Sequence, residues 1–389
     1  MPIPKSECGA KGIVLIENYR AISISPVISK IFEHCILARY SEFLTTSENQ
    51  FGFKKGYGCS HAIYSVRKVV DHYVSAGSTV NVCLLDLSKA FDKMNHYALF
   101  IKLMDRLIPV EMLCVLENWF SLCLSCVKWG SVMSRFYQLK TGVRQGGVLS
   151  PFLFGIFIDD LVKLVDKTNI GCRIAYCCTS IFLYADDVIL LAPSVHALQL
   201  LFNICEKHLN DLDMTINPQK SACLRFGPRH KHACASVTSV SGKAINWVPS
   251  ARYLGVYFES SFKFKCIFDA NKAGFYKSFN SIFGKIGRSA SEEVLFSLIR
   301  SKCLPVLYYG IDVCPINSAI THSLQFTINR VFFKVFGAMS NNSYCELSDY
   351  FGIPSVMSTV RHRQDKFVNS YSSADNVLCR TISVKTVMP

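Results

Sequence analysis

Two adjacent aspartates interrupt an apolar stretch near the middle of the chain. Asp186 and Asp187 lie within residues 181–192, IFLYADDVILLA. Short apolar runs rich in Ile, Val, Phe and Tyr are typical of buried strands, where a carboxylate is costly unless it is paired or bound to a metal. Because neighbours on one strand point to opposite faces, both aspartates can serve one site only if the chain turns there. We therefore predict a β-hairpin with Tyr184 to Asp187 at its tip, holding a metal; a polar turn between two core strands is the alternative.

A further carboxylate ends a second apolar segment. Asp86 follows the apolar residues 82–85 and precedes a change towards a helical pattern. The end of a strand is where α/β proteins commonly place their chemistry. Asp92, six residues later, is interpreted as structural, as a helix cap rather than a metal ligand.

Two glycine-rich segments could contact phosphate or bases. In residues 50–60, QFGFKKGYGCS, the glycines allow close approach of the backbone, and Lys54 and Lys55 can meet phosphate. An exposed basic hairpin is the alternative for this segment. Residues 141–151, TGVRQGGVLSP, precede an apolar helix, and backbone N–H groups at a helix start form a plausible cradle for a nucleotide or a template.

Composition indicates a packed, basic protein. The chain has 389 residues, of which 50% are hydrophobic and 18% charged, so two or three folded domains are expected rather than disorder. The net charge of +14 suggests a polyanionic partner, with a basic but ordinary surface as the alternative.

Cysteine usage suggests an intracellular protein. The 18 cysteines follow no secretory signal, so we expect reduced thiols. The pair Cys123 and Cys126 has no second pair at zinc spacing, and no zinc site is predicted. The apolar stretch 148–165 is interrupted by Asp159, Asp160 and Lys163, so it does not indicate a membrane span, and the two aspartates are placed on a helix surface.

Hydrophobic periodicity and turn residues predict the elements that must position these groups. A helix begins after Ser25-Pro26, where apolar residues of 27–37 recur at three- and four-residue spacing, and residues 251–258 form one strand containing a glycine. The remaining expectations are a helix at 60–75, a helical region at 99–126 broken at Pro109, a hairpin at 127–139, helices at 150–165 and 195–212, and a separate, basic helical domain from 263 onwards.

The order of these motifs is more specific than any one of them. A basic glycine loop is followed by Asp-x4-Phe-Asp, Gly-x-x-Gln-Gly, Tyr-Ala-Asp-Asp, Pro-x-Lys and Tyr-Leu-Gly. This set closely resembles the reverse transcriptase of non-LTR (LINE-type, jockey-like) retrotransposons over residues 17–378. The most specific matches are residues 86–96, 142–154 and 182–187, and residues 304–315, LPVLYYGIDVCP, resemble the thumb region of such elements.

The resemblance implies an α+β fold of the right-hand polymerase type, with fingers, a palm with an antiparallel sheet, and a helical thumb. Residues 1–80 would form the N-terminal part of the fingers, 81–260 the palm with interleaved fingers segments, and 261–389 the basic helical thumb and C-terminal region. The implied activity is RNA-directed DNA polymerisation: an RNA template directs the extension of a DNA primer 3′-hydroxyl with dNTPs. Two Mg²⁺ ions, or Mn²⁺ in their place, would be held by the catalytic residues Asp86, Asp186 and Asp187. Asp86 must then meet the hairpin, which a strand beside the hairpin in an antiparallel sheet would achieve.

Other roles follow from the same resemblance, position by position. Phe91 matches an aromatic gate that excludes a 2′-hydroxyl, which also disfavours an RNA-dependent RNA polymerase; a core aromatic is the alternative. Lys220 matches a lysine that protonates the leaving pyrophosphate; a solvated loop lysine is the alternative. The remaining substrate and primer contacts would be made by Gln145 and Gly146 at the incoming nucleotide, Arg20, Lys54 and Lys55 at the triphosphate, Tyr184 at the hairpin tip, and Tyr253, Leu254 and Gly255 in a primer-grip strand.

The sequence departs from the family pattern in several places. Ala21 stands where relatives usually have Pro, and Ser125 falls where they are often basic. An endonuclease ahead of the polymerase and a Cys/His knuckle after it are not expected, so the chain could be a fragment or relic of a longer protein. The alternative function is therefore a catalytically inactive, nucleic-acid-binding remnant. We expect a nuclear or cytoplasmic protein without a membrane partner; the sequence does not indicate the oligomeric state.

Overall fold

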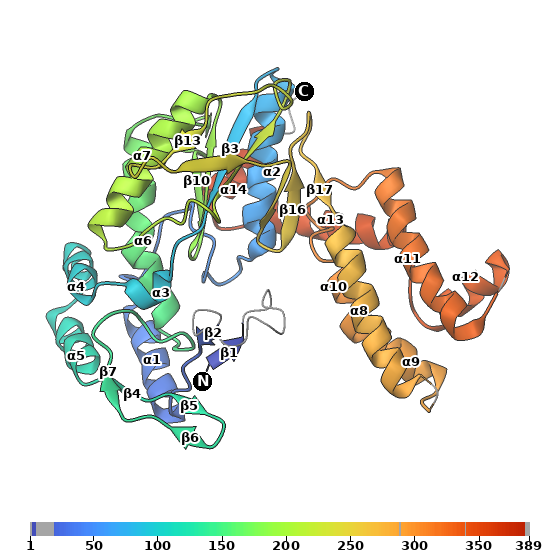
Figure 1. The fold of residues 1–389 in the computed structure, drawn as a ribbon, viewed down its shortest axis with the longest axis horizontal. Helices are drawn as coiled ribbons and strands as arrows, with labels where there is room; N and C mark the ends of the chain where they lie inside the picture. The colour runs from blue at the N-terminus through green and yellow to red at the C-terminus, as the bar shows by residue number, and fades with distance from the viewer. Residues whose placement is uncertain (1, 5–18, 288, 339, 386–389) are drawn as a thin grey trace.

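A computed structural model describes residues 2–4, 19–287, 289–338 and 340–385. Figure 1 shows a body of sheet and helices from which the orange helices α8, α9, α11 and α12 extend to one side. Helices α1 and α5 and the short strands β4 to β7 lie at the opposite end of the body. Helices and strands share one body, so the predicted α+β class is confirmed.

The centre of the body is a mixed sheet. In the part of the chain that the structure describes, six strands follow the order β10-β11-β3-β12-β14-β13. Neighbouring strands are antiparallel except β12 and β14, which run parallel. The strands are β3 (Val80–Leu85), β10 (Ile181–Tyr184), β11 (Asp187–Ala192), β12 (Ala222–Phe226), β13 (Val237–Thr238) and β14 (Ala244–Trp247).

Strand β3 is apolar along most of its length because both faces of the sheet are covered. Val82 and Leu84 pack into one core with residues of α2 (Cys59–Ser75), the blue helix in front of the sheet in Figure 1. Cys83 and Leu85 pack into a second core with residues of α6 (Ser150–Lys167) and α7 (Val195–Asp211). Alternate residues point to opposite faces, so one strand supplies both cores.

The other helices and strands surround this sheet. Pro109 separates two of the helices, as predicted, and the hairpin expected at 127–139 is present as two nested strand pairs. The helices are α1 (Val27–Tyr40), α3 (Ala90–Lys93), α4 (His96–Asp105) and α5 (Val110–Ser121). The short strands are β1 (Pro2–Pro4), β2 (Tyr19–Ala21), β4 (Leu124–Ser125), β5 (Lys128–Trp129), β6 (Val132–Met133), β7 (Tyr137–Gln138), β8 (Arg173–Ile174) and β9 (Cys177–Cys178).

The helix predicted after Ser25-Pro26 is present as α1, and part of its apolar face is exposed. Val27 is 73% exposed and Ile28 80%, whereas the helix buries Glu33 and Ile36. An amphipathic pattern gives the spacing of apolar residues and not the partner that covers them.

Asp159 and Asp160, which were predicted to lie on the surface of α6, both form ion pairs. Asp159 is 2% exposed; it accepts a hydrogen bond from the Ser47 backbone at 2.6 Å and pairs with Arg106 at 2.8 Å. Asp160 pairs with Lys102 at 2.6 Å. The surface assignment of Asp159 was wrong because cationic partners from α4 and its C-terminal end reach this face of α6.

Residues 251–258 form a hairpin and not the single strand predicted. Strands β15 (Ser250–Tyr253) and β16 (Val256–Glu259) pair antiparallel, and β17 (Cys266–Ile267) adds a third strand. Leu254 and Gly255 form the turn with φ of 46° and 85°. Two consecutive positive φ values are what a two-residue hairpin turn requires, and Gly255 supplies one of them without strain.

The helical region, residues 269–385, shares a core with the sheet. Tyr371 is fully buried, and its hydroxyl lies 2.6 Å from that of Ser65 in α2. The elements of this region are α8 (Asp269–Ile286), α9 (Glu292–Leu298), a π-helical segment (Ile299–Cys303), α10 (Leu304–Leu307), α11 (Ser318–Phe336), α12 (Asn341–Tyr350), α13 (Val356–Ser372) and α14 (Val377–Lys385).

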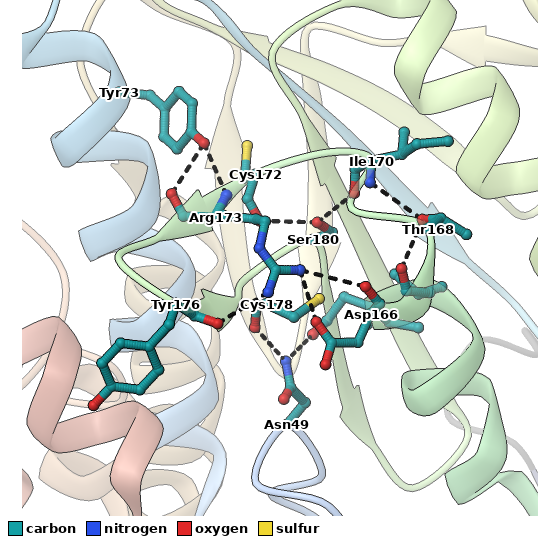
Figure 2. A network of polar contacts seen from close by, with 12 residues as sticks. Asn49, Tyr73, Asp166, Thr168, Ile170, Cys172, Arg173, Tyr176, Cys178 and Ser180 are labelled. Carbon is teal, nitrogen blue, oxygen red and sulfur yellow. Dashed lines mark hydrogen bonds and ion pairs between the residues drawn. The ribbon is translucent and has the colours of Figure 1, made fainter.

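A polar network fixes the start of β10, which leads to the two aspartates (Figure 2). The Asn49 amide donates to the carbonyls of Cys178 and Ile181 at 2.9 and 2.8 Å. The Tyr73 hydroxyl both accepts from the backbone N–H of Arg173 and donates to its carbonyl. The loop between α6 and β10 is therefore tied to α2 and to the segment preceding it, and β10 begins at one defined register.

The cysteines of the described segments are unpaired thiols, as expected. Within the same residues, no helix is both long enough and apolar enough to cross a lipid bilayer.

His61 provides a test of the contact between α2 and the helical region. Its ring packs against Phe367 and Tyr371, its Nδ1 accepts from the Gly58 backbone, and burial lowers its pKa below 6.5. In the unfolded chain His61 takes up a proton near pH 6.5, whereas in the folded protein it stays neutral to a lower pH. Its contribution to stability is therefore complete above pH 6.5 and is lost as the pH falls below this value.

We expect His61→Gln, which keeps a side chain able to cap α2, to lose less thermal stability than the wild type between pH 7.5 and 5.5. Thermal unfolding measured across this range checks the prediction. Parallel pH profiles for the two proteins would contradict it.

Candidate active site

The two central aspartates lie at the tip of a hairpin. Strands β10 and β11 pair antiparallel, and the last pair is Tyr184 with Asp187. Ala185 and Asp186 form the turn, with Ala185 at a φ of 58°. The predicted hairpin from Tyr184 to Asp187 is confirmed.

Asp86 lies beside this tip. Leu85 of β3 pairs with Val188 of β11 in an antiparallel register, so the next residues, Asp86 and Asp187, end neighbouring strands at the same edge of the sheet. The predicted antiparallel neighbour is therefore present. The carboxylates of Asp86 and Asp186 are 100 residues apart in the chain. They come together because β3 and β11 are adjacent strands of the sheet.

Burial and two neighbouring carboxylates disfavour the ionised form of Asp187. Desolvation by the surrounding protein raises the pKa of Asp187 to about 6, and repulsion by Asp186 and Asp86 adds to it. Burial also raises the pKa of Asp186. Arg252 and Arg20 act in the opposite direction on the pKa of Asp187, so both guanidinium groups face the acidic cluster. Arg252 was not predicted as a site residue; it directly precedes the predicted primer-grip residues, which begin at Tyr253.

The donor set suits a hard divalent cation. Over the described residues, no group of three His, Cys, Asp or Glu side chains is close enough together to hold a metal ion. The three carboxylates are nevertheless near enough for each to disfavour the ionisation of Asp187. Oxygen ligands carrying uncompensated negative charge are the kind that Mg²⁺ prefers, so the chemistry of Asp86, Asp186 and Asp187 suits this ion, although their spacing in this structure does not form a closed metal site.

The hairpin tip rests on the glycine loop that follows α1. The Gln50 side-chain oxygen accepts from the backbone N–H groups of Gly52 and Ala185 at 2.9 and 3.2 Å. A Cβ on Gly52 would lie only 2.4 Å from the Ala185 nitrogen. From the sequence, this loop was predicted to contact phosphate, and the role of Gln50 was not predicted. The glycines indicated a close backbone approach, but they did not show that the approaching segment is the hairpin.

The loop carrying Gln145 and Gly146 is held in place by Ser23 and Asp92. The Gln145 carbonyl accepts from the Ser23 backbone at 2.7 Å, and a Cβ on Gly146 would lie 2.6 Å from the Ser23 carbonyl oxygen. The Gln145 amide donates to Asp92 at 3.1 Å. Asp92 is therefore structural, as predicted, but through Gln145 and not as a helix cap.

Glu33 supports the same loop from α1 and was missed by sequence analysis. Its carboxylate is 2% exposed, accepts from the Leu149 backbone at 2.7 Å and lies 3.7 Å from Arg144. The Arg144 guanidinium also lies over the ring of Trp119. The role of Glu33 was not predicted because a charged residue in an amphipathic pattern normally indicates the solvent-exposed face of a helix.

Phe91 is partly exposed and partly packed. Its ring stacks on Phe154 with centroids 4.3 Å apart and meets Phe53 edge to face at 6.2 Å. One face is thus supported by the core, and the ring stands between the Gln145 loop and the glycine loop. This position agrees with both interpretations made from the sequence.

The three basic residues selected for the triphosphate are placed differently. Lys54 donates to the Thr46 and Ser47 carbonyls at 3.0 and 2.6 Å, and burial lowers its pKa. Lys55 and Arg20 are exposed, and Arg20 faces the acidic cluster. The structure therefore brings Arg20, and not Lys54, towards the carboxylates.

Lys220 is exposed on a turn that is fixed to Asp86. The Asp86 N–H donates to the Ser221 hydroxyl at 3.1 Å, and the Asp86 carbonyl accepts from the Asn217 N–H at 2.8 Å. The backbone beside Lys220 therefore moves with the strand end that carries Asp86. Tyr253 is buried, and Leu254 and Gly255 form the hairpin turn described above.

A mixed sheet whose strands β10, β11, β3 and β12 are antiparallel, with an acidic hairpin tip beside a third aspartate, places the chain among the right-hand polymerases. Residues 3–258 match the family profile described as "Reverse transcriptase (RNA-dependent DNA polymerase)". The chain belongs to the reverse transcriptase family.

Its relatives include proteins of mobile elements. The chain is 26% identical over 399 residues to the RNA-directed DNA polymerase from mobile element jockey of Drosophila funebris, covering 95% of this chain and 41% of that protein. It is 23% identical over 257 residues to the Pol polyprotein from type-2 retrotransposable element R2DM of Drosophila melanogaster, covering 64% of this chain and 24% of that protein. The predicted resemblance to retrotransposon reverse transcriptases is confirmed, and the chain spans about two fifths of the jockey protein's length.

A solved telomerase from Candida tropicalis, in complex with a TWJ fragment of telomeric RNA, superposes with a TM-score of 0.44 at 12% identity. The superposition covers 93% of this chain and 57% of the telomerase.

Gly52 provides a test of the contact between the glycine loop and the hairpin. We expect Gly52→Ala to destabilise the protein by about 1–3 kcal/mol because the added Cβ would overlap the backbone at Ala185. Gly284→Ala is the control, since a Cβ at this position inside α8 meets nothing within 4 Å and alanine suits a helix. Denaturant unfolding of both variants measures the difference; equal stabilities would show that the hairpin does not rest on Gly52.

Proposed function

We propose that this chain is an RNA-directed DNA polymerase that extends a primer 3′-hydroxyl with dNTPs. The observation that carries the proposal is the meeting of Asp86 with Asp186 and Asp187 at one edge of the sheet, where they repel one another. Three carboxylates kept together against this repulsion are costly unless a cation is bound during function. Family membership and the mobile-element relatives support the assignment.

Asp86, Asp186 and Asp187 are the residues that would hold Mg²⁺, or Mn²⁺ in its place. When bound, a pair of such ions activates the attacking hydroxyl and stabilises the leaving oxygens of an in-line displacement at phosphorus. The chain's own contribution is the fixed register of β3 against β11, which sets the carboxylates relative to one another before any ion arrives.

The loops around the cluster suit the other parts of the reaction. The Gln145–Gly146 loop, held by Ser23 and Asp92, would lie against the incoming nucleotide, with Phe91 beside its sugar. Arg20 would neutralise the triphosphate from the opposite side of the cluster. Lys220, on the turn fixed to Asp86, would give a proton to the leaving pyrophosphate.

The three parts of the hand are proposed with the boundaries drawn from the sequence. Residues 1–80 supply fingers, 81–260 the palm with further fingers segments, and 261–389 a basic thumb region. The last of these carries 15 basic and 8 acidic residues, which suits a duplex of RNA template and DNA primer. A catalytically inactive, nucleic-acid-binding remnant is the second candidate, since a net charge of +14 would support binding of a polyanion without catalysis.

Primer extension on an RNA template distinguishes the two candidates. We expect the wild type to add dNTPs in the presence of Mg²⁺ and Asp186→Asn to lose extension by at least about a hundredfold, because one charged ligand is removed from the site. Asp365→Asn, at an exposed position of α13, is the matched control and should extend normally. Binding of primer and template without extension by the wild type would identify the remnant.

Phe91 should control the choice between deoxyribonucleotides and ribonucleotides. We expect Phe91→Val to raise the rate of ribonucleotide incorporation relative to that of dNTPs by at least about tenfold, because the bulk beside the sugar is removed. Phe91→Tyr keeps the ring on Phe154 and should keep the selectivity. Single-nucleotide incorporation with matched rNTP and dNTP measures the ratio, and unchanged selectivity in Phe91→Val would reject the gate.

A further inference from the structure

Residues 309–310, within the segment that connects α10 to α11, fit closely onto the β15–β16 turn. The Tyr309 hydroxyl donates to the Leu254 carbonyl at 2.7 Å. A Cβ on Gly255 would lie 2.8 Å from the Tyr309 ring, and a Cβ on Gly310 would lie 2.7 Å from the Val256 side chain. Tyr309 and Gly310 therefore contact the turn and the start of β16, and the two segments can come this close only because Gly255 and Gly310 have no side chain.

The backbone of Tyr309 is held from the other side by α8. Asn271 is 9% exposed, and its amide donates to the carbonyls of Tyr309 and Val306 at 3.0 and 3.2 Å. Gly310 follows with a φ of 83°, a conformation that turns the chain at this point. Tyr309 is thus fixed by its carbonyl to the helical region and by its hydroxyl to the sheet side.

A thiol lies near both this contact and the acidic hairpin. Burial, and then the neighbouring thiol of Cys59, the first residue of α2, raise the pKa of the hydroxyls of Tyr309 and Tyr184. Tyr184 pairs with Asp187 at the hairpin tip. The buried Tyr253 hydroxyl has no hydrogen-bond partner among the described residues. Polar groups from α2, β10 and the helical region are therefore neighbours at this end of the sheet.

We propose that Tyr309 is a positioning residue that sets the Leu254–Gly255 turn relative to the Asp186–Asp187 hairpin. This inference rests on the proposed polymerase function and adds a role for the segment after α10. The turn follows Arg252 of β15 by two residues, and the charge of Arg252 lowers the pKa of Asp187, so this hairpin lies near the carboxylates. A primer 3′ end lying on this turn would be aligned with the metal ligands only while Tyr309 holds the turn in place.

The expected consequence is a loss of rate and not of binding. Reacting groups that are misplaced by about 1 Å can lose about a hundredfold in rate, whereas the contacts with the duplex lie over a much larger surface. The hydroxyl of Tyr309 is the part that fixes the turn, since the ring remains packed against Gly255 when the hydroxyl is removed.

Tyr309→Phe tests the proposal directly in the full chain. We expect the single-turnover rate of dNTP addition to fall about ten- to a hundredfold, with the affinity for primer–template and the thermal stability near those of the wild type. Tyr176→Phe, at an exposed position in the β8–β9 hairpin, is the matched control and should keep the wild-type rate.

The fraction of active molecules separates a positioning role from a structural one. A residue needed only for folding would reduce the burst amplitude and leave the rate per active site unchanged, which would overturn the proposal. Cys59→Ser, which retains a hydrogen-bonding group between the two tyrosines, should stay closer to the wild-type rate than Cys59→Ala; equal rates for the two would remove Cys59 from the network.

The outcome for the wild type distinguishes this inference from the proposed function. Extension by the wild type with an unchanged rate in Tyr309→Phe would reject the positioning role alone. No extension by the wild type would reject the polymerase function, and the role of Tyr309 would be rejected with it.

Discussion

Crowding of three carboxylates at one end of the sheet is the constraint on which the site depends. Burial, and then the charges of Asp186 and Asp86, oppose the ionisation of Asp187, so the strand ends that carry these residues need support from the surrounding structure. That support comes from the register of β3 against β11, from Gln50 and Gly52 beneath the hairpin, and from Asn217 and Ser221 against the backbone of Asp86. The buried cores on both faces of β3 stabilise the sheet strongly enough to offset a local electrostatic cost.

Sequence patterns predicted the parts of this arrangement that are local. The hairpin followed from a period-two argument, because two adjacent aspartates on one strand cannot serve one site. Helices α2, α6 and α7 were predicted to within about two residues because their apolar spacing and flanking residues mark the ends. The Leu254–Gly255 turn was missed because Leu254 has no intrinsic preference for positive φ, and pairing with β16 imposes the conformation.

The supporting residues could not be predicted because they act across long separations. Glu33 accepts from Leu149, 116 residues away, and Gln50 accepts from Ala185, 135 residues away. Asp159 looked solvated because no local pattern shows that Arg106 and the Ser47 backbone approach it. A pattern gives the face of an element that should be buried; it does not identify the segment that buries it. The acidic residues were found through their motif order, while the residues that hold them required coordinates.

The shared core of α2 and the helical region has a consequence for folding. Ser65 meets Tyr371 across 306 residues, and the Asn376 amide donates to the Glu48 carbonyl across 328. Contacts of such separation require large loops to close before they stabilise anything, so formation of this core is expected to be slow. During synthesis, α2 leaves the ribosome with its face towards Tyr371 uncovered until the last helices follow. The early part of the chain is thus an aggregation-prone intermediate, and its lifetime is set by translation of the segment after α12.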